Sequence, residues 1–229
     1  MNAIITGGTK GIGKAIAVKL AESGYNIAVC ARNSEDLRAF AASLAYTGVR
    51  VFTYQADCSL KEEVYAFCEE VAKEMPVVDV LVNNVGTFLP GSVLDEPDDH
   101  LESQLNLNLL ATYYLSKFFG KMMRNQRSGH IFNICSVASK EIVPEAGSYS
   151  VTKVALLSLN NVFRGALSKY NVKVTAILPG STLTSSWEGT DIPAERFVQT
   201  EDIADTIYTI LKLSNGVNVD EVVIKPIQF

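Results

Sequence analysis

The chain has 229 residues, of which 48% are hydrophobic and 20% are charged, and its mean hydropathy is +0.15. This is enough apolar material for a sizeable core, which excludes a disordered or fibrous chain. The formal net charge is −5, and no run of Lys and Arg stands out, so we expect neither nucleic acid nor an anionic membrane as a partner.

Short runs rich in Val, Ile, Leu and Phe alternate with longer segments of helical periodicity. Strands are predicted at residues 3–6, 26–31, 50–55, 79–83, 130–135, 172–178 and 221–225. Helices are predicted at residues 14–23, 34–46, 60–74, 98–126, 150–169 and 200–214. Continuous apolar strands are typical of a parallel sheet that is covered on both faces. The pattern therefore predicts one doubly wound α/β domain over residues 1–229, with a seven-stranded, mostly parallel sheet and helices on both faces.

The first predicted strand and the first predicted helix are joined by the glycine-rich segment TGGTKGIG at residues 6–13. Glycines at 7, 11 and 13 allow a tight turn, close approach of the backbone to a phosphate, and close packing of helix against strand. The free N–H groups at the start of the helix would face a pyrophosphate. A segment of this kind at the start of a βαβ unit predicts a dinucleotide site.

The end of the second predicted strand indicates which dinucleotide binds. An acidic residue here would hold the ribose diol of NAD, but the sequence has Ala31 followed by Arg32. With Lys10 in the glycine segment, Arg32 suits a 2′-phosphate, so NADP(H) is the predicted cofactor. Both cations could also be ordinary surface residues, and Glu35 or Asp36 could still reach the ribose.

Four polar residues further along the chain suggest acid–base chemistry. Asn108 lies in the long middle helix, Ser136 follows the fifth predicted strand, and Tyr149 and Lys153 lie one helical turn apart. A tyrosine is a poor acid or base at neutral pH unless its phenolate is stabilised. A lysine ammonium one turn away provides that stabilisation, and a serine hydroxyl can hold a substrate oxygen.

With these residues in place, the sequence resembles the short-chain dehydrogenase/reductase family over almost its whole length. The shared motifs are T-G-x-x-x-G-x-G at 6–13, Asp57 after the third strand, N-N-x-G at 83–86, Asn108, Ser136, Y-x-x-x-K at 149–153 and P-G-x-x-x-T at 179–184. The resemblance implies a Rossmann fold and an Asn–Ser–Tyr–Lys tetrad. Tyr149 would exchange a proton with the substrate oxygen, and Ser136 would position and polarise that oxygen. Lys153 would assist the ionisation of Tyr149 and bind the nicotinamide ribose, and Asn108 would hold a water of a proton relay.

The resemblance also implies how the cofactor is held. In this family, cations at the positions of Lys10 and Arg32 usually accompany NADP(H). Asp57 would meet the adenine amine, Asn84 and Gly86 would line the adenosine ribose, and Thr184 would touch the nicotinamide side. The predicted cofactor-binding residues are Gly7, Thr9, Lys10, Gly11, Ile12, Gly13, Arg32, Asp57, Asn84, Gly86, Tyr149, Lys153, Pro179, Gly180 and Thr184.

The sequence departs from the family pattern at two places. Val85 stands where the family usually has Ala, and the segment 221–229 lacks the glycine-rich ending of the 3-oxoacyl-carrier-protein reductases. That ending is closer to bacterial sepiapterin-reductase-like members. We therefore expect an NADPH-dependent carbonyl reductase. The alternatives are a 3-oxoacyl-carrier-protein reductase and, from another class, a non-catalytic cofactor-sensing protein on the same fold.

A short substrate lid is predicted at residues 181–199. It is polar around Trp187, which would be either a substrate platform or a hydrophobic latch. Such a lid suits a small, compact carbonyl compound better than a carrier-bound acyl chain, and Glu188 and Asp191 would repel an acidic carrier protein. Four basic residues could form a docking face for a carrier protein, but they could equally be the solvent-exposed side of a helix (Lys117, Lys121, Arg124 and Arg127).

The four cysteines are scattered, without a C-x-x-C pair or a histidine at ligand spacing (Cys30, Cys58, Cys68 and Cys135). They predict free thiols and no metal site. The strand-like start at residue 3 leaves no room for a signal peptide, so a cytoplasmic protein is expected. His100 and His130 lie far from the motifs. By resemblance, the helices at 98–126 and 150–169 would pair subunits into a homodimer or homotetramer.

Overall fold

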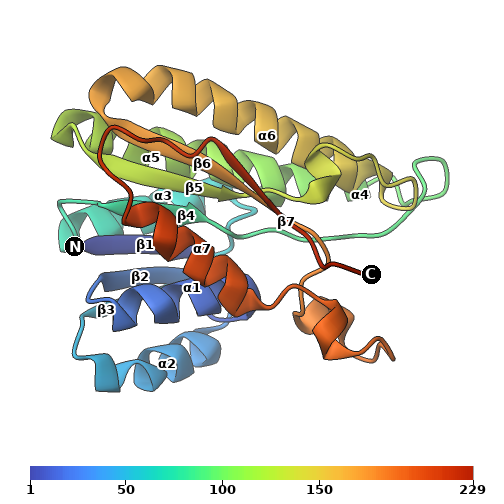
Figure 1. Cartoon of the computed structure of the whole chain (residues 1–229), viewed down its shortest axis with the longest axis horizontal. Helices are drawn as coiled ribbons and strands as arrows, with labels where there is room; N and C mark the ends of the chain where they lie inside the picture. Colours follow the sequence, from blue (N-terminus) through green and yellow to red (C-terminus); the bar gives the residue numbers. More distant parts are fainter. Residues whose placement is uncertain (229) are drawn as a thin grey trace.

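Seven parallel strands form one sheet in the computed structural model, which describes residues 1–228, and helices cover both faces of the sheet (Figure 1). The strands are β1 (Asn2–Thr6), β2 (Asn26–Ala31), β3 (Val51–Gln55), β4 (Val80–Asn83), β5 (Gly129–Ile134), β6 (Val172–Pro179) and β7 (Glu221–Ile224). Their spatial order is β3-β2-β1-β4-β5-β6-β7, and every neighbouring pair is parallel. The predicted doubly wound α/β fold is confirmed, with a sheet that is wholly parallel.

The helices form two layers. On one face lie α1 (Gly11–Glu22), α2 (Ser34–Ser43) and α7 (Thr200–Leu211), and on the other lie α3 (Lys61–Glu74), α5 (Ala111–Gln126) and α6 (Gly147–Leu167). The chain adds β2 and β3 on one side of β1, then crosses back and adds β4 to β7 on the other side. This reversal leaves a crevice at the C-terminal ends of β1 and β4, where doubly wound proteins bind ligands.

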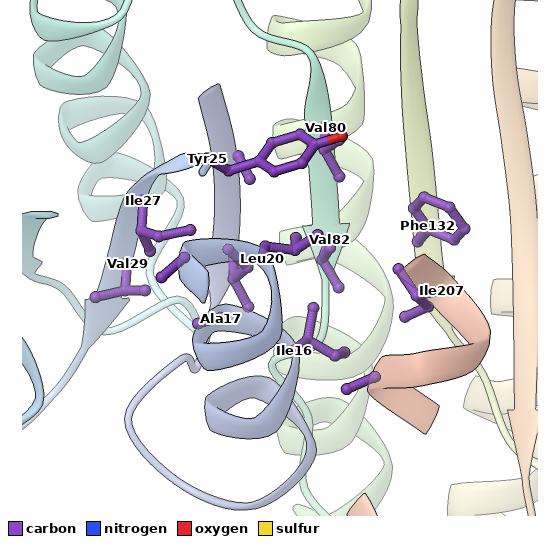
Figure 2. Packing of buried hydrophobic residues seen from close by; sticks show 14 of the residues in the cluster. Ile16, Ala17, Leu20, Tyr25, Ile27, Val29, Val80, Val82, Phe132 and Ile207 are labelled. Carbon is purple, nitrogen blue, oxygen red and sulfur yellow. The ribbon is translucent and has the colours of Figure 1, made fainter. Parts of the chain in front are cut away.

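The core lies between the sheet and each helix layer, because central parallel strands bury side chains on both faces. Ile16 and Leu20 of α1 pack against β2 and β4, and Ile207 of α7 lies beside Phe132 of β5 (Figure 2). On the opposite face, Phe67 of α3 and Phe119 of α5 are completely buried. Together the two clusters bury both faces of the sheet.

Three helices differ from the sequence-based prediction in ways that affect the site. α6 begins at Gly147 instead of residue 150, which places Tyr149 in its first turn. α1 begins at Gly11 instead of residue 14, so the glycine segment itself forms the first helical turn. The predicted helix at 98–126 is divided into α4 (His100–Leu105) and α5 by a π-turn at Asn106–Leu110. Such turns are frequent at functional sites, and this one contains Asn108.

The four cysteines are buried free thiols, as predicted. Within residues 1–228, no helix is both long and apolar enough to span a membrane. In the same residues, no group of three His, Cys, Asp or Glu side chains is placed to hold a metal ion.

Candidate active site

The glycine segment turns sharply between β1 and α1. Gly7 and Gly11 have φ angles of +64° and +52°, and a Cβ at Gly13 would lie 2.3 Å from the Gly7 carbonyl oxygen. All three positions therefore require glycine. Within the described chain no side chain caps the start of α1, so its first N–H groups are available to an anion, which the helix dipole also favours.

The N-N-V-G turn after β4 is fastened to the glycine segment. Asn84 Nδ2 donates to the carbonyls of Thr6 (2.9 Å) and Gly7 (3.2 Å). The backbone N–H groups of Asn84 and Val85 both donate to Thr6 Oγ1 at 3.1 Å. Val85 packs against the apolar cluster of α3 and α5, which explains why a side chain larger than alanine is accommodated here.

Residues predicted to bind the adenosine end lie at the C-terminal ends of β2 and β3. Asp57 Oδ1 accepts hydrogen bonds from the Ser59 N–H (2.9 Å) and hydroxyl (2.7 Å). Partial burial raises the pKa of Asp57, but these hydrogen bonds and the nearby Arg32 guanidinium outweigh it and hold the pKa below its ordinary value. Lys10 Nζ lies 2.7 Å from Asp36 Oδ2. Both cations therefore face carboxylates of this chain, with which a bound phosphate would compete.

Ser136, Tyr149 and Lys153 come from the end of β5 and the first turns of α6. Lys153 is almost completely buried; its Nζ donates to the Ile134 carbonyl at 3.1 Å and lies 5.6 Å from the centroid of the Tyr149 ring. Ser136 Oγ accepts from the Ala138 N–H at 3.1 Å, so its own proton is available to another acceptor. Two oxygen donors and one cation are thus placed around one space.

Asn108 is completely buried behind this group. Its Oδ1 accepts from the Thr87 N–H at 2.7 Å, and its Nδ2 donates to the Thr87 carbonyl at 2.9 Å and to Thr152 Oγ1 at 3.1 Å. Thr152 Oγ1 in turn donates to the Tyr149 carbonyl at 2.8 Å. A Cβ at Gly86 would lie 3.1 Å from Asn108 Oδ1 and 3.7 Å from Lys153 Nζ, so Gly86 lets these two side chains approach the same point.

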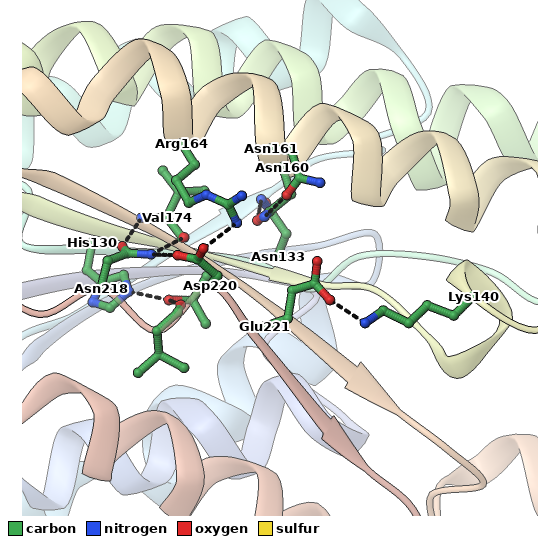
Figure 3. A network of polar contacts seen from close by, with 12 residues as sticks. His130, Asn133, Lys140, Asn160, Asn161, Arg164, Val174, Asn218, Asp220 and Glu221 are labelled. Atoms are coloured by element: carbon green, nitrogen blue, oxygen red, sulfur yellow. Dashed lines mark hydrogen bonds and ion pairs between the residues drawn. The ribbon is translucent and has the colours of Figure 1, made fainter.

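A row of buried amides holds α6 over the sheet. Asn83 Nδ2 donates to Asn133 Oδ1 at 2.8 Å, and Asn133 Nδ2 donates to Asn160 Oδ1 on α6 at 2.9 Å. Nearer the surface, Arg164 of α6 pairs with Asp220, which precedes β7 (Figure 3). Because buried amides must be paired, these bonds fix the position of α6 and therefore of Tyr149 and Lys153.

A cavity of about 480 Å³ opens at the C-terminal ends of β4, β5 and β6. Its lining includes Ser136, Tyr149 and Lys153 together with Ile12, Asn84, Gly86, Pro179, Gly180 and Thr184. Thr9, Lys10 and Gly11 line a neighbouring groove of about 710 Å³, and Thr184 lines both. Of the predicted site residues, five line neither the cavity nor the groove: Gly7, Gly13, Arg32, Asp57 and Asn108. The cavity, which contains Ser136, and the groove, which contains Lys10, meet at Thr184, the residue that lines both.

Sequence reasoning missed three residues of this site. Thr6 joins the two turns, Thr152 links Asn108 to Tyr149, and Phe88 lines the cavity with its ring edge-on to Tyr149, at 4.9 Å between centroids. Thr152 lies inside the Y-x-x-x-K motif, and this position was the signal by which the sequence could have identified it. The sequence contains no comparable signal for Phe88.

Other residues singled out in the sequence have structural surroundings of their own. Trp187 lines the cavity and packs on Phe197, with ring centroids 5.1 Å apart; its role as substrate platform or hydrophobic latch stays a prediction. His130 is buried, bonded to Thr175 Oγ1 at 2.7 Å, away from the cavity lining. Basic side chains of the conceivable docking face lie over tyrosine rings: Lys117 over Tyr113, and Arg124 and Arg127 over Tyr170.

Comparison with known proteins gives consistent likenesses over the whole chain. A family model described as short chain dehydrogenase matches residues 1–192. An uncharacterised oxidoreductase of Staphylococcus aureus is 31% identical over 228 residues, which are 98% of this chain and 96% of that protein. An alcohol dehydrogenase from the archaeon Thermococcus sibiricus, solved in complex with 5-hydroxy-NADP, is 28% identical with a TM-score of 0.91, covering 99% of this chain and 96% of its own. L-sorbose reductase from Gluconobacter frateurii, solved with NADPH and L-sorbose, is 27% identical with a TM-score of 0.91, covering 98% of this chain and 95% of its own.

Proposed function

Because this chain belongs to the short-chain dehydrogenase family, we propose that it is an NADP(H)-dependent oxidoreductase that reduces a carbonyl group to an alcohol. The observation that carries the proposal is the cavity that Ser136, Tyr149 and Lys153 line together. A hydroxyl that can hold an oxygen, a phenol that can give a proton and a cation that can stabilise the phenolate are the groups that carbonyl reduction needs.

The recess beside the glycine segment fits a dinucleotide. Gly13 lets α1 pack closely on the Gly7 carbonyl, and Gly11 lines the groove, where a Cβ would lie 3.3 Å from Thr184. Without a side chain at Gly11, the backbone can approach a pyrophosphate closely. Lys10 and Arg32 would hold a 2′-phosphate, and Asp57 would meet the adenine. When bound, the nicotinamide supplies the hydride. The NADP and NADPH complexes of the two similar structures support this cofactor.

Tyr149 would donate its proton to the substrate oxygen while Ser136 donates a hydrogen bond to the same atom. The Lys153 ammonium, held by the Ile134 carbonyl, would stabilise the negative charge left on the Tyr149 oxygen. The side-chain amide of Asn108 is engaged by Thr87 and Thr152. We therefore assign Asn108 the role of holding the Thr87 loop and α6 in register.

The substrate is a small free carbonyl compound rather than an acyl chain on a carrier protein. The lid segment contributes small polar side chains and Trp187 to the cavity, which suits a compact ligand. Of the four basic residues that a carrier could contact, three lie over tyrosine rings of this chain (Lys117, Arg124 and Arg127).

We further assign residues 1–229 to one domain with a lid at 181–199. Exposed valines on α6, at Val151, Val154 and Val162, support a homodimer or homotetramer. Four unpaired cysteines suit the cytoplasm, where thiols stay reduced.

The test is the oxidation of NADPH by the purified protein with ketones, diketones, pterins and 3-oxoacyl thioesters. Tyr149→Phe keeps the ring but removes the proton donor, so we expect turnover to fall by about 10²–10⁴-fold with NADPH binding nearly unchanged. Tyr46→Phe carries the same change on the surface and is the control. A Tyr149→Phe variant that kept more than about a tenth of the activity would overturn the tetrad.

The same assay separates the alternatives. Efficient reduction of an acetoacetyl thioester, with negligible rates on diketones and pterins, would favour the carrier-protein reductase. NADPH binding without turnover on any substrate would favour the cofactor-sensing protein.

A further inference from the structure

The wall of the cavity contains an apolar part that the proposed cofactor and proton chemistry do not use. Its lining side chains are Phe88, Val137, Val143 and Trp187. Among the described lining residues, Lys153 is the one charged side chain, and it is bonded to the Ile134 carbonyl. The four side chains of the apolar part are uncharged, so an anionic group of a substrate placed against them would find no cation there.

Phe88 is held in position although 51% of it is exposed. Its ring meets the Tyr149 ring edge-to-face, with centroids 4.9 Å apart and an interplanar angle of 83°. The preceding residue, Thr87, is clamped through both its N–H and its carbonyl by the side chain of Asn108. An exposed aromatic ring that is fixed beside the proton donor is a preorganised contact for a ligand.

Trp187 is fixed in a similar way. Its indole packs on Phe197, which is buried, and its backbone N–H donates to the Thr184 carbonyl at 3.0 Å. Two anchored aromatic side chains thus line the cavity that also contains Ser136 and Tyr149. Aromatic rings favour planar apolar partners over charged or heavily hydroxylated ones.

We propose that this wall, formed by Phe88, Val137, Val143 and Trp187, binds an aryl or other planar apolar group of a neutral ketone or aldehyde, whose carbonyl oxygen faces Ser136 and Tyr149. This inference rests on the proposed function and adds the substrate class to it. It disfavours 2-oxo acids and sugar phosphates, because their anionic groups would lose water without gaining a cation.

Four substrates test separately the preference for an aryl group and the preference for a neutral substrate. Ethyl benzoylformate, benzoylformate, ethyl pyruvate and pyruvate combine an aryl or methyl group with a neutral ester or a carboxylate. With NADPH, we expect kcat/KM for ethyl benzoylformate to exceed that for ethyl pyruvate, and that for benzoylformate, by about tenfold or more, the size of one good aromatic or charge contact. Equal values, or a preference for the methyl or anionic substrate, would overturn the proposal while leaving the proposed function intact.

Phe88→Ala assigns the preference to this wall. We expect it to lower the aryl-to-methyl ratio of kcat/KM by about tenfold, whereas Tyr46→Ala, which removes an exposed ring elsewhere, leaves the ratio unchanged. Phe88→Leu keeps apolar bulk without the ring and should give an intermediate ratio. An unchanged ratio in correctly folded Phe88→Ala would overturn the assignment.

Binding can be measured without turnover, because Trp187 is the only tryptophan of the chain. In the wild type with NADP⁺, which cannot reduce a ketone, ethyl benzoylformate should change tryptophan fluorescence saturably and ethyl pyruvate should not. Free tryptophan with the same additions is the control. If none of the four compounds is reduced, the proposed function fails for them, and this titration alone decides the inference: saturable binding of the aryl ester supports it, and no binding overturns it.

Discussion

The hydroxyl of Thr152 joins two parts of the site that lie on different elements. It accepts a hydrogen bond from Asn108, in the π-turn before α5, and donates one to the Tyr149 carbonyl on α6. Asn108 in turn holds both backbone groups of Thr87. A single threonine therefore links the loop of Phe88 to the helix that presents Tyr149.

Thr152→Val keeps the shape of the side chain and removes both hydrogen bonds. Asn108 Nδ2 would lose one of its two acceptors and keep the Thr87 carbonyl. An unpaired buried N–H costs about 1–3 kcal/mol, or about 5- to 150-fold in rate if the loss falls on the transition state. We expect kcat/KM to fall within that range while the Kd for NADPH changes little. Thr152→Ser should restore activity, since it returns the hydroxyl. Failure of serine to rescue would mean that the methyl group, not the hydrogen bonds, is what the site requires.

Arg32 tests the choice of cofactor. Arg32→Asp removes a cation from the predicted 2′-phosphate site and adds a repelling charge beside Asp57, so NADPH binding should weaken about tenfold or more relative to NADH binding. Arg50→Asp makes the same charge change at the start of β3 and serves as the control. Direct titration of both cofactors measures the effect. A wild type that already binds NADH more tightly would contradict the assignment of Lys10 and Arg32.

Among the elements, the strands were predictable because most of them are nearly continuous apolar runs. The helix boundaries were harder to predict than the strands. The start of α1 at Gly11 depends on a positive φ angle at that residue, which composition does not reveal. The π-turn is stabilised by contacts of Asn108 with Thr87 and Thr152, residues distant in sequence, so local periodicity could not indicate it.

The candidate site was predictable as far as motifs extend. Ser136, Tyr149 and Lys153 meet because parallel strands place the residues that follow them at one edge of the sheet. Phe88 was not predictable, because a phenylalanine near a turn has no distinguishing pattern before its neighbours are known. The ion pair of Lys10 with Asp36 also required the fold, since it joins the glycine segment to α2.

β5 contains a buried titratable group that makes the fold sensitive to acid. Burial, with a smaller effect from Lys173, lowers the pKa of His130 from 6.5 to about 3. Below pH 6.5, His130 therefore becomes protonated in the unfolded chain while it stays neutral in the folded chain. The contribution of this residue to the free energy of unfolding is fully present above that pH. It declines as the pH falls toward 3, by at most about 1.4 kcal/mol per pH unit.

His130→Gln can still bond to Thr175 but does not titrate, so the decline in its free energy of unfolding between pH 6.5 and 4.5 should be shallower than that of the wild type. Denaturant titrations at a series of pH values measure the slope. His100→Gln, at the other histidine of the chain, is the control for the substitution itself. Equal slopes in wild type and His130→Gln would show that acid sensitivity arises elsewhere.

Across the whole molecule, helix α6 presents two faces of different character. One face of α6 presents Tyr149 and Lys153 to the cavity and packs on the sheet through Asn160. The outward side has exposed valines at 151, 154 and 162, spaced so that they share a stripe. Twenty-one residues make a helix of about 30 Å, long enough to form one side of a subunit contact.

A homodimer formed through this stripe would bury apolar surface that otherwise faces water. A stable contact buries about 800 Å² per partner, and a carboxylate placed in it would be desolvated without a counter-charge, which costs several kcal/mol. Val162→Asp, at the most exposed of the three valines (64%), should therefore shift the wild-type oligomer to monomer in sedimentation or light scattering. Val77→Asp, on the loop between α3 and β4, makes the same change on an exposed valine away from α6 and should leave the oligomer intact. If the wild type is already monomeric, or if the Val162→Asp variant stays associated, the subunits do not pair through this face. Because α6 also positions Tyr149, a loss of activity on dissociation would show that pairing supports the site.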